Sequence, residues 1–349
     1  MKRRARASLL VAAPLLAALL IAAASAALWR GVQDLNRPLH LSALTVYRVV
    51  PGASLAHVAT DLAARGMLHD PHLWVWYARW HGLAAAVRAG EYAIRPGTTP
   101  RGLLQQMVKG EVLLHAFTIV DGWRVADLLA ALRRDPYLRA TLPPRPVDLM
   151  AKFAAPGLSP EGQFLPETYK FPLGTSDVAL LAMAHKALLT ELQAAWKRRD
   201  ADLPLQDPEE LLTVASIVEK ETALPAERQK IAGVYLHRLA IGMRLQADPT
   251  IIYGLGERYG GSLHSADLRR DGPYNTYTRA GLPPTPIALP GAAAIEASAH
   301  PEIGDALYFV ASEKGDGSHI FSATLEEQDA AVGRYLSRLR RKAAGGGEQ

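Results

Sequence analysis

Residues 211–222, LLTVASIVEKET, form the stretch around which the fold and the chemistry of this chain are expected to be organised. The preceding segment DPEE, at residues 207–210, offers a capping side chain, a proline for the first turn and acidic groups for the positive end of a helix dipole. At about 100° per residue, one side of this helix is apolar and holds Leu211, Leu212, Val214, Ala215 and Val218. The other side is expected to carry Thr213, Ser216 and Lys220.

Glu219 falls inside the apolar stripe, because it follows Leu211 and Ala215 at i+8 and i+4. A carboxylate in such a stripe is either paired in a salt bridge or kept protonated by desolvation, and a general acid near neutral pH needs the protonated form. Helix geometry alone leaves both interpretations open. Glu221 is expected at the polar boundary, beside Glu210, so Glu219 is the stronger candidate for an acid.

The composition indicates a globular protein of two or three modest domains, since 49% of the 349 residues are hydrophobic. The formal net charge is +5, but four basic residues lie among the first six and the remainder is near balance. No basic stripe with interleaved aromatic residues occurs, so nucleic acid is not an expected partner. The lack of cysteine excludes disulfides, cysteine metal sites and cysteine nucleophiles.

Residues 8–29 carry no charge and are mostly alanine and leucine, which predicts a helix that crosses a hydrocarbon core of about 30 Å. Positive charge before this run indicates a cytoplasmic N-terminus, with the chain after Arg30 on the periplasmic side of an inner membrane. The competing interpretation is a cleaved signal peptide ending near ASA at 24–26, although the apolar run is long for one. Residues 1–30 are thus a cytoplasmic tail and anchor, and residues 31–43 a polar tether.

One pattern occurs twice within residues 44–112. VVPGASL at 49–55 and AIRPGTT at 93–99 each predict a short strand, a Pro-Gly turn and a Ser or Thr cap before a helix. A weaker third copy, FTIVDGW at 117–123, leads into another amphipathic run. The first two copies resemble a LysM-like module, which in other proteins binds the glycan of bacterial cell walls. The alternative is a small α+β scaffold that positions the next domain.

Four aromatic residues, Trp74, Trp76, Tyr77 and Trp80, lie on one helical stretch between the first two copies. Aromatic rings suit the faces of sugars, but a pair at i and i+4, such as Trp76 and Trp80, is more often part of a core. We therefore assign these residues to packing.

We expect the rest of the chain to divide into a connecting segment over residues 113–205 that forms part of a cleft, a catalytic domain over 206–340 and a flexible tail over 341–349. A helix is predicted over 226–241. Turn-rich segments with amides, an aspartate and phenols follow between residues 243 and 287. Such segments are typical of the lining of a carbohydrate cleft.

Two other catalytic designs are poorly supported by the sequence. Ser216 and Lys220 are one residue too far apart for a Ser-x-x-Lys pattern, and neither is expected on the apolar face. No HExxH or paired-histidine motif occurs among the eleven histidines, so no metal site is expected. His300 and His319 are assigned to structure or to the lining of the cleft.

Five motifs occur in order between residues 215 and 301. They are ASIVEKET at 215–222, GMRLQADPTIIYG at 242–254, YNTY at 274–277, GLPPTPIALPG at 281–291 and AHP at 299–301. Together they resemble the MltG (YceG-like) family of endolytic murein transglycosylases, with similarity over roughly residues 45–336. The resemblance implies an α+β fold with an N-terminal transmembrane helix, a small LysM-like α+β subdomain and a larger α+β YceG-like catalytic domain.

The resemblance also implies a reaction, which is cleavage of the β-1,4 bond between N-acetylmuramic acid and N-acetylglucosamine within glycan strands, leaving a 1,6-anhydro end. Family catalysis rests on one glutamate of the E-K-E-T segment, here Glu219, which would act first as general acid and then as base. No cofactor is implied. The partners implied are peptidoglycan glycan strands, the membrane and cell-wall synthases. The candidates for substrate binding are Gln246, Asp248, Tyr253, Asn275 and Tyr277.

Two further functions stay open at this level. The chain could be a non-catalytic, membrane-tethered scaffold whose LysM-like part binds peptidoglycan. It could also be a membrane-anchored hydrolase, although hydrolases of this bond generally need two carboxylates. Anhydro ends on cut strands would separate a transglycosylase from both.

Overall fold

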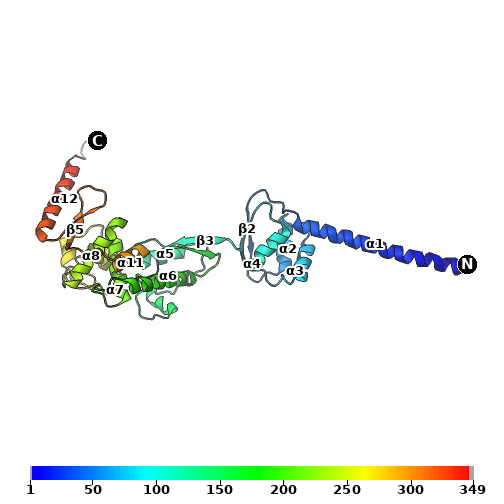
Figure 1. Cartoon of the computed structure of the whole chain (residues 1–349), viewed down its shortest axis with the longest axis horizontal. Helices are drawn as coiled ribbons and strands as arrows, with labels where there is room; N and C mark the ends of the chain where they lie inside the picture. Colours follow the sequence, from blue (N-terminus) through cyan, green and yellow to red (C-terminus); the bar gives the residue numbers. More distant parts are fainter. Residues whose placement is uncertain (1, 346–349) are drawn as a thin grey trace. The chain divides into compact units, whose positions relative to one another are not determined.

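The protein combines helices with short two-stranded sheets, which confirms the α+β class (Figure 1). The computed structural model describes residues 2–345. The chain forms two compact units. Unit 1 comprises Met1–His115 and Phe171–Leu173, and unit 2 comprises Ala116–Lys170 and Gly174–Gln349.

The chain begins with one continuous helix, α1 (Lys2–Asn36). Its apolar residues between Leu15 and Trp29 whose side chains are described lie exposed on all sides of the helix. Among the helices within the described residues, none is long and apolar enough to cross a membrane. The side chains of residues 1–14 and 17, which include part of the span expected over 8–29, lie outside the described residues. The anchor therefore stays a prediction.

Unit 1 confirms the repeated strand, turn and capped helix. Strand β1 (Thr45–Val49) precedes α2 (Leu55–Ala64), and β2 (Gly90–Ile94) precedes α4 (Pro100–Lys109). The two strands pair antiparallel, with Tyr47 opposite Tyr92. The caps form as expected, because the hydroxyl of Ser54 accepts from the N–H of His57 at 3.2 Å and that of Thr99 accepts from Gly102 at 3.0 Å.

Helix α3 (Pro71–Trp80) lies between the two copies and corrects the assignment of its aromatic residues. Trp74 is buried and donates through its indole N–H to the carbonyl of Pro100 at 2.8 Å. Trp76 and Trp80 are instead 51% and 74% exposed. The assignment of these two residues to packing was wrong, because α3 buries the side that carries Trp74 and Ala78 and turns the Trp76 side outward.

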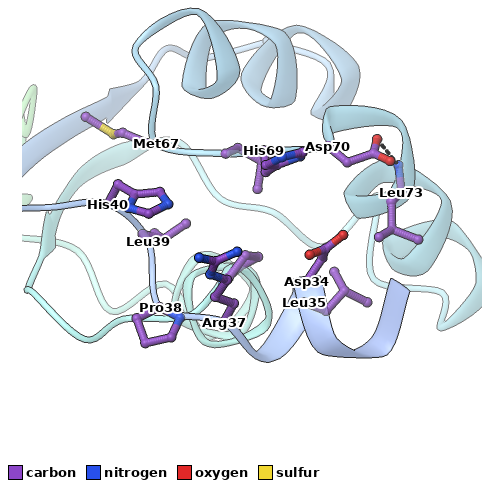
Figure 2. Close-up of a pocket in the computed structure, with 12 residues that line it drawn as sticks. Asp34, Leu35, Arg37, Pro38, Leu39, His40, Met67, His69, Asp70 and Leu73 are labelled. Carbon is purple, nitrogen blue, oxygen red and sulfur yellow. Dashed lines mark hydrogen bonds between the residues drawn. The ribbon is translucent and has the colours of Figure 1, made fainter. Parts of the chain in front are cut away.

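A small hollow lies in unit 1 where the residues after α1 meet the turn before α3 (Figure 2). Its volume is about 30 Å³, which suits water rather than a sugar. Asp70 caps α3 beside it by accepting from the N–H of Leu73 at 2.9 Å. The other polar residues that line it are Asp34, Arg37, His40 and His69.

Unit 2 begins with the third copy of the pattern. Strand β3 (Leu114–Thr118) pairs with β4 (Thr168–Pro172), and α5 (Val125–Arg134) follows the turn at Asp121 and Gly122. Short 3₁₀ turns occupy Pro146–Asp148 and Met150–Phe153. The long helix α6 (Asp177–Arg198) then packs against α7 (Pro208–Glu221), which is the helix predicted from residues 207–222.

Helix α7 lies at the centre of unit 2, in contact with α6, α8 (Arg228–Ala240), α9 (Asp248–Leu255) and α11 (Ala292–Ala299). Its neighbours in the core include Ile231, Leu236 and Ile295. The strands β5 (Tyr308–Ala311) and β6 (His319–Ser322) pair antiparallel and contact α12 (Leu325–Gly345). The elements after α7 are a 3₁₀ turn (Pro225–Glu227), α8 (Arg228–Ala240), α9 (Asp248–Leu255), a 3₁₀ turn (Gly256–Arg258), α10 (Ser265–Arg269), α11 (Ala292–Ala299), β5 (Tyr308–Ala311), β6 (His319–Ser322) and α12 (Leu325–Gly345).

Candidate active site

The helix that carries the candidate acid starts and ends as its sequence predicts. Asp207 caps α7 by accepting from the N–H of Glu210 at 2.9 Å, and Pro208 occupies the first turn. The expected polar face is absent over most of the helix, however, because all eight residues from Leu211 to Val218 are buried. Helices surround α7 on several sides, so position on a helical wheel does not decide burial here.

Ser216 shows how this burial changes a side chain's role. Its hydroxyl donates to the carbonyl of Thr213 at 2.7 Å and accepts from the N–H of Ile287 at 3.0 Å. The expectation that Ser216 lies off the apolar face was wrong. Lys220 donates instead to the carbonyl of Gly122 at 3.2 Å. Ser216 and Lys220 therefore serve different partners, which gives no support to a serine–lysine mechanism.

Glu219 shows features of both interpretations that the sequence left open, an ion pair and desolvation. Its side chain is only 7% exposed. One carboxyl oxygen, Oε2, accepts from the N–H of Gly291 at 3.1 Å, and the other, Oε1, lies 3.7 Å from a guanidinium nitrogen of Arg228. Desolvation raises the pKa of Glu219, and the nearby charge of Asp121 adds to this, against the lowering effects of Gly291, Arg228 and Lys220. The side chain is thus biased toward its protonated form.

Asp121 is a second carboxylate beside Glu219, and the sequence analysis did not select it. Its Oδ1 and the Oε2 of Glu219 lie 2.4 Å and 3.5 Å from the position that a Cβ atom would take at Gly291. Backbone hydrogen bonds hold the turn at Asp121 against the segment before Gly291. The N–H of Gly122 donates to the carbonyl of Leu289 at 2.8 Å, and the N–H of Leu289 donates to the carbonyl of Trp123 at 2.7 Å. Asp121 itself is exposed. Its signal in the sequence was the Asp-Gly turn of the third copy.

Arg228 is the second residue that sequence analysis missed. It begins α8, and its side chain is 16% exposed beside Glu219. Within the part of the chain that the structure describes, its buried Nε has no hydrogen-bond partner. Because a guanidinium stays charged at all ordinary pH values, Arg228 supplies a fixed positive charge next to the Glu219 carboxyl.

Glu221 occupies a different environment from the one we expected. Its Oε1 accepts from the hydroxyl of buried Tyr235 at 2.5 Å, and Arg238 lies nearby. Burial raises the pKa of Glu221 to about 7, despite the opposing hydrogen bond from Tyr235. The expectation that Glu221 points to a polar boundary was wrong, because α8 covers this end of α7.

Two of the predicted substrate-binding residues gather near Glu221. The hydroxyl of Tyr277 donates to Oδ1 of Asp248 at 2.6 Å, and the charge of Asp248 raises the pKa of Glu221 further. Gln246 is exposed and has a φ of 50°, which is uncommon for a residue other than glycine. Its N–H donates to the carbonyl of Thr276 at 3.1 Å.

Asn275 and Tyr253, the other two, organise the loops between α9 and α11. The Asn275 amide donates to the carbonyls of Asp267, Leu268 and Arg270, and its oxygen accepts from the N–H groups of Tyr277 and Thr278. This occupies the amide fully. The hydroxyl of Tyr253 donates to Oε2 of Glu161 at 3.2 Å.

Glu161 is a further buried carboxyl that the sequence analysis did not select. It is 6% exposed and accepts from the N–H of Val125 at 2.9 Å as well as from Tyr253. Burial raises the pKa of Glu161 to about 7, while these two hydrogen bonds and the charge of Arg124 oppose the shift. Its position between α5 and α9 ties the start of unit 2 to the loop region.

The described hydrogen bonds and ion pairs of Glu219 therefore run to Gly291 and Arg228, and not to any of the five predicted substrate-binding residues. Within the described residues, no group of three or more histidine, aspartate or glutamate side chains could hold a metal ion. His300 pairs with Asp200 at 2.8 Å, and His319 pairs with Glu227 at 2.7 Å.

Comparison with known proteins bears on this arrangement. The sequence profile of the YceG-like family matches residues 47–334. An endolytic murein transglycosylase of Bacillus subtilis (strain 168) is 29% identical over 308 residues, which cover 82% of this chain and 83% of that protein. An endolytic murein transglycosylase of Streptococcus pneumoniae (strain D39) is 26% identical over 321 residues, and these cover 82% of this chain but only 57% of that protein.

A solved structure is also similar. The crystal structure of a yceG-like protein from Listeria monocytogenes matches 82% of this chain and 98% of its own, with 26% identity and a TM-score of 0.49. The profile match spans both units and includes residues 215–301, in which the five motifs occur.

Proposed function

The chain belongs to the YceG-like family, and from this premise we propose that it is an endolytic murein transglycosylase. It cuts the β-1,4 bond between N-acetylmuramic acid and N-acetylglucosamine inside glycan strands and leaves 1,6-anhydro ends. The observation that carries this proposal is the carboxyl of Glu219, which is almost buried, biased toward protonation and held by a backbone N–H within the matched region.

In the first step, Glu219 donates its proton to the glycosidic oxygen as the bond from that oxygen to C1 breaks. The carboxylate that remains is stabilised by the N–H of Gly291 and the guanidinium of Arg228, both already in place. In the second step, the C6 hydroxyl oxygen of the sugar that carries this C1 bonds to C1, and the proton of that hydroxyl passes to Glu219. The acid is thereby restored and no water is consumed.

A tethered nucleophile explains why one carboxyl suffices. The C6 hydroxyl belongs to the reacting sugar, so the loss of entropy in bringing it to C1 is small. Asp121, the exposed carboxylate beside Glu219, has a different role in this proposal. Its negative charge keeps Glu219 protonated before the reaction and stabilises the positive charge that develops at C1 during the reaction.

The exposed side chains among the predicted substrate-binding residues, Gln246 and Asp248, are proposed to contact the glycan. Tyr253, Asn275 and Tyr277 are proposed to support them from behind, since their polar groups already bind protein atoms. The loops around them also border a hollow of about 420 Å³ beside Tyr274 and Asn275.

The attachment to the wall and the membrane belongs to the same proposal. We propose that α1 anchors the chain in the inner membrane, with both units on the periplasmic side, and that the repeated module over residues 44–112 has a LysM-like role in binding glycan. Cell-wall synthases are the proposed partners, because an enzyme that cuts strands internally limits the length of new strands.

The decisive comparison is between Glu219→Gln and Glu221→Gln in the purified chain. Each change is nearly isosteric. Glu219→Gln is expected to lower the release of anhydro ends from intact glycan strands by about a hundredfold or more, since the general acid is lost. Glu221→Gln is expected to keep the activity, because Tyr235 and α8 enclose this carboxyl. Mass spectrometry of the products and circular dichroism of both variants provide the readouts.

Each other outcome points to a different function. Activity that survives in Glu219→Gln but not in Glu221→Gln would move the acid to residue 221. Products that carry oxygen from labelled water would indicate a hydrolase. A wild-type chain that sediments with the wall but cuts nothing would be a non-catalytic scaffold.

A further inference from the structure

The outward side of α3 carries two tryptophans whose exposure the fold does not require. Trp76 and Trp80 stack on each other, with ring centroids 5.5 Å apart and an angle of 26° between the rings. They remain 51% and 74% exposed. The core of unit 1 is completed by the opposite side of the same helix, where Trp74 and Ala78 are fully buried. Exposure of two large apolar rings side by side marks an interaction surface.

This aromatic pair lies next to the end of the uncharged run in α1. Trp76 and Trp80 line the same hollow, of about 240 Å³, as Ala27 and Leu28. The position of α1 here is fixed, because Leu35 belongs to the core of unit 1. The pair is therefore level with the last turns of the apolar run, just before the first charge after that run at Arg30.

The apolar surface extends beyond the two tryptophans. Leu28 and Trp29 are 62% and 65% exposed, and the apolar side chains of α1 that are described between Leu15 and Ala27 are exposed on every side of the helix. Tryptophan is enriched at the level where a hydrophobic segment leaves the hydrocarbon and meets the lipid headgroups. Three exposed tryptophans at the end of one apolar run match that level.

The hollow beside the pair is lined by basic side chains. Arg101 and His81 line the hollow, and among its described lining residues there is no carboxylate. Arg79 is also exposed on α3, between the two tryptophans in sequence. Arginines that flank an apolar surface favour anionic phospholipid headgroups. A sugar-binding platform would instead be expected to present carboxylates or several amides for hydroxyl groups.

We propose that Trp76 and Trp80, together with Leu28 and Trp29, form a membrane-contact surface that enters the boundary between headgroups and acyl chains of an anionic bilayer. This proposal rests on the membrane attachment included in the proposed function. It adds the two tryptophans of α3 to the contact that α1 makes, and this holds unit 1 against the membrane surface.

Quenching by brominated phospholipids tests this placement in the full chain. The chain is incorporated into vesicles of phosphatidylcholine and phosphatidylglycerol, with bromine near the headgroup end of the acyl chains. Trp29→Phe serves as the background because Trp29 itself lies in the apolar run. Five of the six tryptophans remain. The brominated lipid is expected to quench the emission of Trp76 and Trp80, and the additional changes Trp76→Phe and Trp80→Phe to abolish most of that quenching.

The matched control replaces Trp196 by phenylalanine in the same background. Because Trp196 belongs to unit 2, its loss is expected to leave the amount of emission that the brominated lipid quenches unchanged. Flotation of the vesicles separates two kinds of failure. A chain that floats but shows equal quenching with and without the pair would overturn the contact surface and leave the membrane attachment standing. A chain that does not float would overturn both, whatever its activity on glycan.

Purified glycan strands provide the last arm. If they change the emission of the background chain but not of the variant without the pair, while brominated lipid quenches neither, the pair is a sugar platform and the proposal is wrong.

Discussion

The carboxyl of Glu221 is the most informative group to perturb, because it makes the stability of unit 2 depend on pH. Burial against Tyr235 raises its pKa from about 4.5 to about 7. The folded state therefore binds this proton more tightly than the unfolded state does. The contribution to stability is fully present below pH 4.5 and is lost as the pH rises through 7.

The magnitude follows from the size of the shift. Each pKa unit corresponds to about 1.4 kcal/mol. A rise of the pKa from 4.5 to about 7 therefore means that Glu221 lowers the free energy of unfolding by about 3 kcal/mol above pH 8 relative to pH 4. Glutamine at this position cannot ionise, yet its carbonyl oxygen can still accept from Tyr235. The free energy of unfolding of Glu221→Gln, relative to that of the wild type, is therefore expected to increase by about 3 kcal/mol as the pH rises over this range.

Amide hydrogen exchange, read by mass spectrometry on peptides from α7 and α8, measures the effect within unit 2. Comparison of the two proteins at the same pH cancels the chemical exchange rate. A change of about 3 kcal/mol corresponds to a factor above one hundred in the exchange rate of amides that exchange only when this region opens. The matched control is Glu257→Gln, whose side chain is exposed after α9.

The result that would refute the reasoning is a constant ratio of exchange rates between the wild type and Glu221→Gln from pH 4.5 to 8.5. Such a result would mean that the pKa of Glu221 is the same in the folded and the unfolded protein. Glu221 would then no longer be an enclosed, structural carboxyl. The preference for Glu219 as the acid rests partly on that role of Glu221, and it would also have to be given up.

The remaining predictions concern the surroundings of Glu219. Asp121→Asn removes a charge that raises the pKa of Glu219, so the fall in kcat/KM at high pH should move to lower pH; Arg228→Gln removes a charge that lowers it and should move the same limb to higher pH. Both are read from pH–rate profiles, and unchanged profiles would exclude these two residues from the site. Gly291→Ala puts a methyl group 2.4 Å from the Asp121 carboxylate and should reduce the rate of anhydro-end release at least tenfold, whereas Gly304→Ala, which meets nothing within 4 Å, should keep it.

The sequence could predict much of the local structure. The caps at Ser54, Thr99 and Asp207 form because a hydroxyl or carboxylate satisfies backbone N–H groups within the same short segment. The repeated strand, turn and helix form for the same local reason. The desolvated position of Glu219 was also predictable, since apolar neighbours one and two turns away lie beside it on the same helix.

The sequence could not predict which side of a helix another element covers. Two faces were expected for α7, yet α6, α8 and α11 enclose it, so that Ser216 is buried and Glu221 meets Tyr235. In α3 the opposite happened, because Trp76 and Trp80 were expected in the core but face away from it.

The sequence by itself determined the repeated strand, turn and helix, the capped helices and the presence of a carboxyl in an apolar setting at residue 219, since these depend on neighbours within a few residues. The α+β class of the whole chain followed from the resemblance of five motifs to a known family. Only the tertiary structure placed Asp121, Arg228 and Gly291 around that carboxyl. Asp121 precedes Glu219 by almost a hundred residues and Gly291 follows it by about seventy. Contacts over such separations are set by the packing of whole elements, which no local pattern encodes.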